Sequence, residues 1–458
     1  MSYCYDSLRS EEYYGYLRSY NRQRERFAYI KTFGCQQNEA DSEKISGILL
    51  DIGYKITESP ERADLIILNT CSVRSHAEEK VFSLLGGYKE YKKQNPELII
   101  GVVGCMGANS AARDMIKKSF HYVNFTLGAG VMHKLPELLY TVITTGKRRF
   151  LQPNERECIV EKIPTERTFG RTKYVSVMYG CDNFCSYCIV PYTRGRERSR
   201  ESLDIINECR ELIESGASEI MLLGQNVNSY RADIDFPKLL EKIASLSGDF
   251  TLRFMTSHPK DVSPRLCEVM AKYKDKIAPA FHLPLQSGSD RILKDMNRKY
   301  TKEAFIATAD MIRSYVPTVF LTTDVIVGYP GESEEDFEDT LDVLSRVRFD
   351  AVYAFIYSAR VGTRAALRTD TVEDAVKKER IARLLSLQDE ILIKKNAELI
   401  GKTLTVCCEK WESDSRSSGR TKAGRLVHFD SPRDVSGEYV NVKITSVGAY
   451  DLIGTAEE

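Results

Sequence analysis

The chain has 458 residues with 65 basic and 65 acidic side chains, so its formal net charge is zero. A chain of this length should form about two to four domains, because single cores rarely grow beyond roughly 250–300 residues. The balanced net charge gives no support for nucleic-acid binding by the whole molecule, so RNA contacts would have to be argued from local basic patches. No apolar run reaches the roughly 18–20 residues of a membrane helix, and we expect no membrane association.

The N-terminal segment 1–26 is rich in Tyr, Arg and Glu and lacks the apolar centre of a signal peptide. We expect a polar extension, helical in part. Twelve cysteines without an export signal favour reduced thiols and metal ligands over disulfides. The sequence therefore predicts a cytoplasmic protein.

An alternating α/β pattern fills residues 27–150. Short apolar strands alternate with helices, which is typical of a parallel sheet. The predicted strands lie at 27–33, 64–69, 98–103 and 124–128, and the predicted helices at 39–51, 75–94 and 134–144.

Three cysteines of this region, Cys35, Cys71 and Cys105, each follow the C-terminal end of a predicted strand. In open α/β sheets that edge is where ligands bind, so we expect the three thiols to converge. The alternative is three unrelated buried cysteines, a common fate of this residue. Three such placements in succession, each beside Gly, Thr or Ser, favour a shared metal cluster.

Residues 151–170 are polar and basic and are predicted to be a linker, in which Cys158 is structural. Residues 171–396 then repeat α/β units with polar turns after each strand, which resembles a partial (β/α) barrel. Its strands are predicted at 174–178, 219–223, 251–255, 280–285, 319–327 and 351–357, and its helices at 202–215, 236–245, 264–272, 302–314, 335–347 and 371–396.

The first barrel strand leads into the loop 180–188, in which Cys181, Cys185 and Cys188 have the spacing C-x3-C-x2-C. Soft thiolates select iron–sulfur clusters, zinc or Cu(I). A structural zinc site or an ordinary four-iron cluster needs four ligands, and no fourth Cys or His lies nearby. One corner of a cluster would stay open for a reactant. Three buried cysteines in a turn are the alternative, which the polar loop makes a poor fit.

The hydrophobic period changes to two in residues 397–458. Short strands at 403–406, 425–429, 439–444 and 452–455 are separated by Gly, Ser and Asp turns. This pattern predicts a small antiparallel β-barrel.

A series of short motifs runs through these regions, at 33–38, 69–74, 104–105, 180–188, 191–197, 223–228, 255–259, 283–289 and 419–421. Together they resemble the MiaB-type tRNA methylthiotransferases of the radical S-adenosylmethionine (SAM) superfamily. The resemblance implies the family's domain order: a methylthiotransferase N-terminal domain, a radical SAM (β/α)6 barrel and a TRAM domain. Gln37 stands where the family often has Met, the TRAM loop is 421–424, and the segment 1–26 lies outside the pattern.

The resemblance implies two [4Fe-4S] clusters, with Cys181, Cys185 and Cys188 binding the one that cleaves SAM. An auxiliary cluster would be bound by Cys35, Cys71 and Cys105. One SAM would methylate a sulfur on the auxiliary cluster, and a second would give a 5′-deoxyadenosyl radical. That radical would take hydrogen from C2 of an isopentenylated adenosine at position 37 of the tRNA anticodon loop, which then receives methylthio. The family also implies an electron donor such as flavodoxin or ferredoxin, and we expect a monomer.

Further cofactor contacts follow from the family and from strand ends. Tyr187 would contact the SAM adenine, and Ile326 would line the adenine site. Four polar residues end barrel strands and are predicted to hydrogen-bond SAM or substrate, with turn-capping as the alternative: Gln225, Ser257, Gln286 and Ser289. His258 would touch substrate or be a satisfied core histidine.

Two basic stretches are candidates for RNA binding, since arginine and lysine bind phosphate. The alternative is an ordinary solvated face. The first contains Arg194 and Arg196 and follows the metal loop; the second contains Arg420, Lys422 and Arg425 and lies in the small barrel.

Other functions share these features. A related methylthiotransferase modifies ribosomal protein S12, and the motifs at 69–74 and 192–197 resemble the tRNA branch instead. A sister tRNA enzyme acts on threonylcarbamoyladenosine, and the motif at 35–38 argues against it. A non-enzymatic iron–sulfur RNA-binding module or electron carrier is the third alternative. A carrier would keep four ligands on each cluster, which the two sets of three cysteines argue against.

Overall fold

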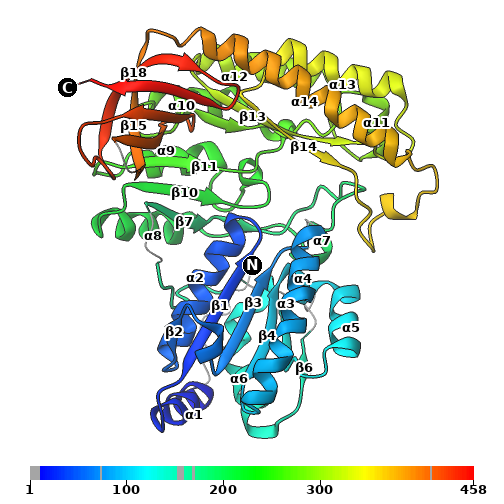
Figure 1. The fold of residues 1–458 in the computed structure, drawn as a ribbon, viewed down its shortest axis with the longest axis vertical. Coiled ribbons are helices and arrows are strands. Elements are labelled where there is room, and N and C mark those ends of the chain that lie inside the picture. The colour runs from blue at the N-terminus through cyan, green and yellow to red at the C-terminus, as the bar shows by residue number, and fades with distance from the viewer. Residues whose placement is uncertain (1–10, 73–74, 152–158, 168–170, 413–414, 458) are drawn as a thin grey trace. The chain divides into compact units, whose positions relative to one another are not determined.

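The computed structural model describes residues 11–72, 75–151, 159–167, 171–412 and 415–457 (Figure 1). The predicted structural role of Cys158 lies outside the described residues. The chain forms two compact units. Unit 1 comprises Met1–Leu212, Leu222–Gln225 and Arg360–Thr363, and unit 2 comprises Ile213–Met221, Asn226–Ala359 and Arg364–Glu458.

Unit 1 contains a six-stranded sheet with the order β2-β1-β3-β4-β5-β6, and all its pairings are parallel. This confirms the predicted parallel sheet. The two edge strands were not predicted, because three and two residues are too short to show a period. The strands are β1 Phe27–Phe33, β2 Lys55–Thr57, β3 Leu65–Thr70, β4 Ile99–Gly104, β5 Phe125–Gly128 and β6 Arg149–Phe150.

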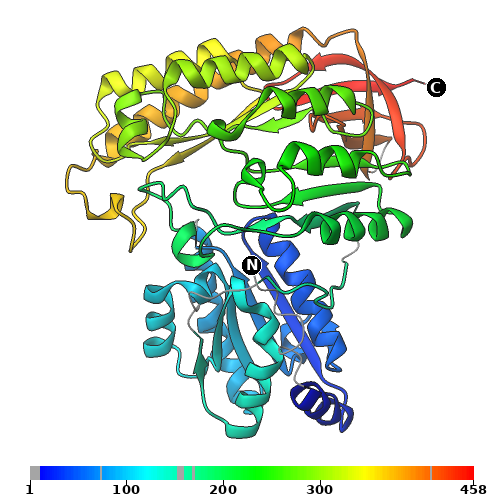
Figure 2. The same ribbon diagram turned by 180° about the vertical axis from the view of Figure 1, so that it is seen from behind.

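Helices cover both faces of this sheet (Figure 2). Strand β3 is buried throughout, and its side chains alternate between two cores. Leu65 and Ile67 pack with residues of α1, α2 and α6, whereas Ile66 and Leu68 pack with residues of α3 and α5. The helices are α1 Glu11–Arg22, α2 Gln36–Asp51, α3 Ser75–Gln94, α4 Cys105–Ala108, α5 Ser110–Ser119 and α6 Leu135–Thr145, with 3-10 turns η1 Pro60–Arg62 and η2 Ala129–Lys134.

Within the N-terminal extension, helix α1 begins at Glu11 and packs against the sheet domain of unit 1. Leu17 is fully buried, and the ring of Tyr13 lies 5.0 Å from that of Tyr140 on α6. Helix α1 therefore contributes apolar surface to the core that it shares with α2 and α6.

A two-residue antiparallel pair closes the metal loop at its base. Strand β8 (Met178–Tyr179) pairs with β9 (Arg198–Ser199). Between them lie the three loop cysteines and helix α7 (Val190–Thr193). Strand β7 (Thr172–Ser176) precedes the pair, and helix α8 (Ser202–Glu214) follows it.

The predicted barrel strands form two three-stranded sheets, β11-β10-β7 and β12-β13-β14. The predicted strand 280–285 ends at His282, since Pro284 has no N–H to donate to a neighbour. The elements are β10 Glu219–Leu223, η3 Val227–Ser229, α9 Phe236–Ala244, β11 Thr251–Phe254, η4 Pro259–Asp261, α10 Pro264–Lys272, β12 Ala280–His282, α11 Asp290–Asp295, α12 Lys302–Tyr315, β13 Phe320–Val327, α13 Glu334–Val347, β14 Ala351–Ile356, η5 Ala365–Leu367 and α14 Asp374–Ala397.

The C-terminal strands close into a barrel of order β15-β16-β17-β19-β18. The predicted small barrel is confirmed, with one correction: β17 and β19 are parallel, because the chain crosses from β17 to β18 before β19 returns. Strand β16 was missed, since its sequence is polar and contains Gly419, which packs against the Cys407 backbone. The strands are β15 Thr403–Trp411, β16 Arg416–Thr421, β17 Leu426–Asp430, β18 Tyr439–Val447 and β19 Asp451–Ala456.

A buried carboxylate joins this barrel to the rest of unit 2. The side chain of Asp350 is fully buried and pairs with Arg425 and with Lys395 of α14 (2.8 Å). Its second oxygen accepts the N–H of Leu321 at 2.9 Å. Arg425 also donates to Asn396 at 3.0 Å, so three elements meet at one charge cluster.

We expect Asp350→Ala to destabilise unit 2 by about 3–5 kcal/mol, because it leaves two cations without their buried partner. Trp411, the single tryptophan of the sequence, lies in β15 and reports barrel unfolding by fluorescence in urea. The matched control is Glu438→Ala, which removes an exposed ion pair with Arg433 worth about 0–1 kcal/mol. Equal urea midpoints for the two variants would contradict the role assigned to Asp350.

Candidate active site

Cys35, Cys71 and Cys105, here the edge triad, lie at the C-terminal ends of the adjacent strands β1, β3 and β4. Cys35 caps helix α2, and Cys105 begins helix α4. The thiol of Cys71 is hydrogen-bonded to that of Cys105. The negative charges of Cys105 and Cys35 both raise the pKa of Arg194, so both thiols lie near this arginine. Topology therefore gathers the three thiols at one edge.

Two buried asparagines fix the backbone around the edge triad. Asn38 donates to Asn69 at 3.1 Å, and Asn69 donates back to the Asn38 carbonyl at 2.8 Å. The Asn38 side chain also accepts from the N–H of Cys35 at 3.4 Å. The sequence motifs contained both residues, but no role was assigned to them, because their pairing joins helix α2 to strand β3 across 31 positions of the chain.

Glycines flank two of these cysteines because the chains approach closely. A Cβ on Gly34 would lie 2.9 Å from the Cβ of Cys71, and one on Gly104 would lie 2.5 Å from Asn69 Oδ1. Gly104 also has φ +85°, in the left-handed region. Any side chain at these positions would separate the thiols.

Arg194 reaches the edge triad from the segment after the metal loop. Its side chain is only 5% exposed; Nε donates to Cys105 Sγ at 3.2 Å and Nη2 to Asp41 Oδ2 at 3.0 Å. Burial by itself would lower the pKa of Arg194, but the negative charges of Cys105, Asp41 and Cys35 raise it. The guanidinium of Arg194 is thus committed to a thiol and a buried carboxylate, and RNA contact by this residue stays a prediction.

The same contacts favour a thiolate at Cys105. The hydrogen bond from Cys71 and the charge of Arg194 lower the pKa of Cys105 to about 6, against the opposing effect of burial. Thiolates are the form that binds metals. The donor set of the edge triad thus fits an iron–sulfur cluster.

The second set, Cys181, Cys185 and Cys188, is here called the loop triad. Its loop is held by the Cys181 N–H, which donates to the Gly195 carbonyl at 3.2 Å, and by the Cys188 N–H, which donates to Cys185 at 3.0 Å. Burial raises the pKa of Cys181, which hydrogen bonds from Asn183 partly oppose. Protein groups alone do not favour this thiolate, so a bound cation would have to.

In the described part of the chain, no three Cys, His, Asp or Glu side chains are disposed to hold a single metal ion. Both triads consist of soft sulfur donors, and each supplies three of them.

Two polar contacts brace the loop triad. Arg196 donates to both oxygens of Asp182, at 2.7 and 3.0 Å, and its side chain is 72% exposed. Gln225, predicted to contact SAM, instead accepts a hydrogen bond from the Gly180 N–H through its side-chain oxygen. Gln225 therefore positions the loop. RNA binding by Arg196 and adenine contact by the half-buried Tyr187 stay predictions.

The remaining cofactor candidates lie in unit 2. Ser257 is buried, and its hydroxyl has no partner among the described residues, which fits a missing ligand. Gln286 is buried at φ +70°, and Ile326 is half-buried on β13. Ser289 caps helix α11 and donates to Asp336 at 2.5 Å, so its predicted ligand contact is replaced by the turn-capping alternative.

The histidine candidate is a structural cap. His258 Nδ1 accepts from the Lys260 N–H at 3.2 Å, and burial lowers the pKa of its imidazole to about 2. The ring stays neutral at physiological pH, as expected for a satisfied core histidine.

The basic residues of the small barrel differ from one another. Arg425 belongs to the Asp350 cluster, and RNA contact by this residue stays a prediction. Lys422 is half-buried and donates to the carbonyl of Asp275. Arg420 is half-exposed, and its nearest carboxylate, Glu409, lies 3.6 Å away. Among the predicted residues of this barrel, Arg420 has the most accessible charge.

Two protein families match this chain, one over the edge triad and one over the loop triad. Residues 27–128 match the family described as "Uncharacterized protein family UPF0004", and residues 175–344 match the radical SAM superfamily. Each match contains one cysteine triad. In the described residues, no helix is long and apolar enough to cross a membrane.

Relatives extend over the whole chain. A tRNA-2-methylthio-N(6)-dimethylallyladenosine synthase of Thermoanaerobacter sp. (strain X514) is 46% identical over 445 residues, covering 96% of this chain and 94% of the relative. The enzyme of the same name from Caldicellulosiruptor saccharolyticus is 46% identical over 431 residues, covering 93% and 91%.

Solved structures share the fold at low identity. The radical SAM methyltransferase TsrM from Kitasatospora setae has a TM-score of 0.54 at 12% identity, covering 75% of this chain and 77% of that chain. The cobalamin-dependent SAM radical enzyme OxsB has a TM-score of 0.52 at 13% identity, covering 81% and 57%. These similarities concern architecture alone.

We expect Arg194→Met to lose about half of the iron bound after anaerobic reconstitution, because the edge triad loses the cation that favours its thiolates. Iron and sulfide content, with EPR of the reduced protein, measure this directly. The control is Arg196→Met, which removes an exposed arginine near the loop triad and should retain the edge cluster. Full iron content in the Arg194 variant would show that its charge is dispensable there.

Proposed function

The chain belongs to the family of tRNA-2-methylthio-N6-dimethylallyladenosine synthases within the radical SAM superfamily, and on that premise we propose how its two triads divide the reaction. The loop triad binds a [4Fe-4S] cluster and SAM, and the edge triad binds an auxiliary [4Fe-4S] cluster. The substrate is N6-isopentenyladenosine at position 37 of a tRNA anticodon loop, and the product is its 2-methylthio derivative. The observation that carries the division is the presence of three cysteines, not four, in each set.

When bound, the two clusters supply reductive cleavage of SAM and a transferable sulfur, chemistry that side chains alone lack. The chain's own residues hold these groups in place. Asn38, Asn69 and the flanking glycines keep the edge thiols together, and Arg194 supplies the nearby positive charge. Gln225 and the pair of Asp182 with Arg196 hold the loop triad.

The orphan hydroxyl of Ser257 is the best supported polar contact for SAM in unit 2. A buried hydroxyl without a partner costs about 1–3 kcal/mol, which a ligand would recover. Gln286 and Ile326 are further proposed SAM contacts in unit 2, and Tyr187 is a proposed contact in unit 1. Reduction requires an electron donor such as flavodoxin or ferredoxin, and the chain acts as a monomer in this proposal.

Mass spectrometry of tRNA nucleosides after incubation with reconstituted protein, SAM and reductant tests the reaction. We expect methylthiolated isopentenyladenosine with the wild type. Replacing the edge triad by alanine should abolish this product while SAM-dependent 5′-deoxyadenosine still forms, whereas replacing the loop triad should abolish both.

The same assay separates the alternatives. Methylthiolated threonylcarbamoyladenosine would identify the sister tRNA enzyme, and a mass gain on ribosomal protein S12 without tRNA modification would identify a protein-modifying enzyme. A reduced holoprotein that cleaves no SAM would leave only an iron–sulfur binding module.

We propose that Arg420 contributes to tRNA binding on the small barrel. Arg420→Glu should weaken tRNA binding about tenfold at moderate salt, since reversal replaces a phosphate attraction by repulsion, and leave SAM cleavage unchanged. Arg433→Glu makes the same change of charge at another exposed arginine of this barrel and should alter affinity less. Equal affinities for wild type and the Arg420 variant would remove Arg420 from the interface.

A further inference from the structure

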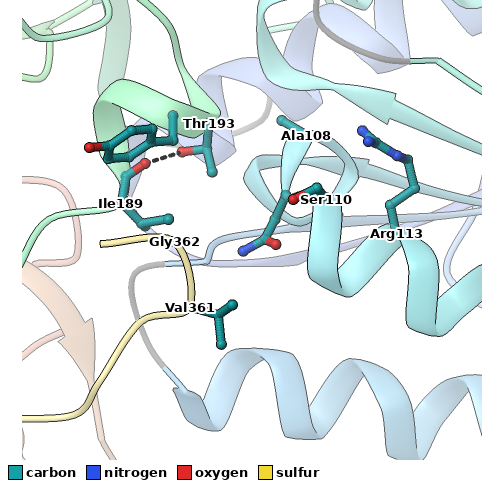
Figure 3. A pocket seen from close by; sticks show the side chains of 9 residues that line it. Ala108, Ser110, Arg113, Ile189, Thr193, Val361 and Gly362 are labelled. Carbon is teal, nitrogen blue, oxygen red and sulfur yellow. Dashed lines mark hydrogen bonds between the residues drawn. The ribbon is translucent and has the colours of Figure 1, made fainter. Parts of the chain in front are cut away.

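A cavity of about 270 Å³ lies within unit 1, next to the segments that follow both triads (Figure 3). Ala108 lies at the end of helix α4, which begins at Cys105. Ile189 directly follows Cys188 and leads into helix α7. The volume of the cavity is near the lower end of the roughly 300–1,000 Å³ usual for ligand pockets.

The cavity contains one unexplained charge. Arg113 of helix α5 lines it, is 8% exposed, and has no ion pair in the part of the chain that the structure describes. Its Nη1 atom is buried without a hydrogen-bond partner among the described residues. Because an unpaired buried charge is costly, this side chain needs a negatively charged partner.

The other lining residues fit an anion with an attached planar group. None of the described residues that line the cavity is acidic. Asn109 presents a carboxamide whose oxygen already caps α5 by accepting from Ala111 at 3.0 Å and Ala112 at 3.3 Å. The ring of Tyr192 is 51% exposed at the same cavity. Exposed aromatic rings of this kind stack on nucleobases.

We propose that this cavity binds a backbone phosphate of the tRNA anticodon loop through Arg113, with an adjacent base against Tyr192. A guanidinium matches a phosphodiester because it can donate two parallel hydrogen bonds to its oxygens. The inference rests on the proposed function, which supplies the RNA. It adds a recognition site that lies outside both cysteine triads and outside the small barrel.

Binding of an anticodon stem-loop RNA to the reconstituted holoenzyme, measured by fluorescence anisotropy over a range of salt, tests the site. Arg113→Gln should weaken binding about tenfold and lower the salt dependence by about 0.7, the value for one phosphate in a single strand. Arg113→Lys should recover part of the affinity but not the bidentate geometry. Lys118→Gln, an equal loss of charge at an exposed position of α5, should bind as the wild type.

Single neutral methylphosphonate substitutions in the loop identify the phosphate. One position should weaken binding by the wild type and have no effect on Arg113→Gln. Thermal unfolding distinguishes a structural role, since removing an unpaired buried charge should leave the melting temperature unchanged or raise it.

Three results would overturn the site. Equal affinity and salt dependence for Arg113→Gln and wild type, with methylthiolation intact, would reject the phosphate contact and leave the proposed function standing. If Arg113→Gln weakened the binding of SAM and left RNA binding unchanged, Arg113 would be assigned to the SAM carboxylate. Absence of RNA binding by the wild-type holoenzyme would reject both the site and the function.

Discussion

A buried arginine between a thiol and a carboxylate is the contact on which the candidate active site depends. Arg194 lies six positions beyond Cys188, yet its guanidinium bonds to Cys105 and Asp41 in the N-terminal sheet domain. Buried pairs of this type are held only where geometry is good, because desolvation opposes them. The contact therefore couples the metal loop to the edge triad within one compact unit.

Much of the fold could be predicted from the sequence, since it depends on local periodicity. Parallel strands such as β3 are uniformly apolar, and cysteines placed after them must share an edge. Short or polar strands were not predicted. Strand β16 is an example, because it has no apolar alternation and is ordered by its pairing with β15 and β17. The parallel direction of the β17–β19 pair was not predicted either, because it depends on a crossover that no local pattern encodes.

The roles of polar and charged side chains were harder to predict, because the sequence does not reveal their partners. Two basic stretches suggested phosphate contacts, but one arginine in each, Arg194 and Arg425, is committed to a buried carboxylate. Ser289 similarly caps a helix. Conversely, the isolation of Arg113 becomes evident only when all its neighbours are known. The convergence of Cys35, Cys71 and Cys105 could be predicted because strand order alone places them at one edge, whereas their role as ligands stays a prediction.

The position of Arg194 also bears on how the chain matures. A fragment ending before this residue would contain all three edge cysteines and their asparagine supports, but Cys105 would lack the cation that favours its thiolate. The nascent N-terminal domain would thus leave the ribosome as a weaker acceptor of iron. The edge triad would gain that cation once residue 194 has been synthesised, when more than half of the chain is still to be made.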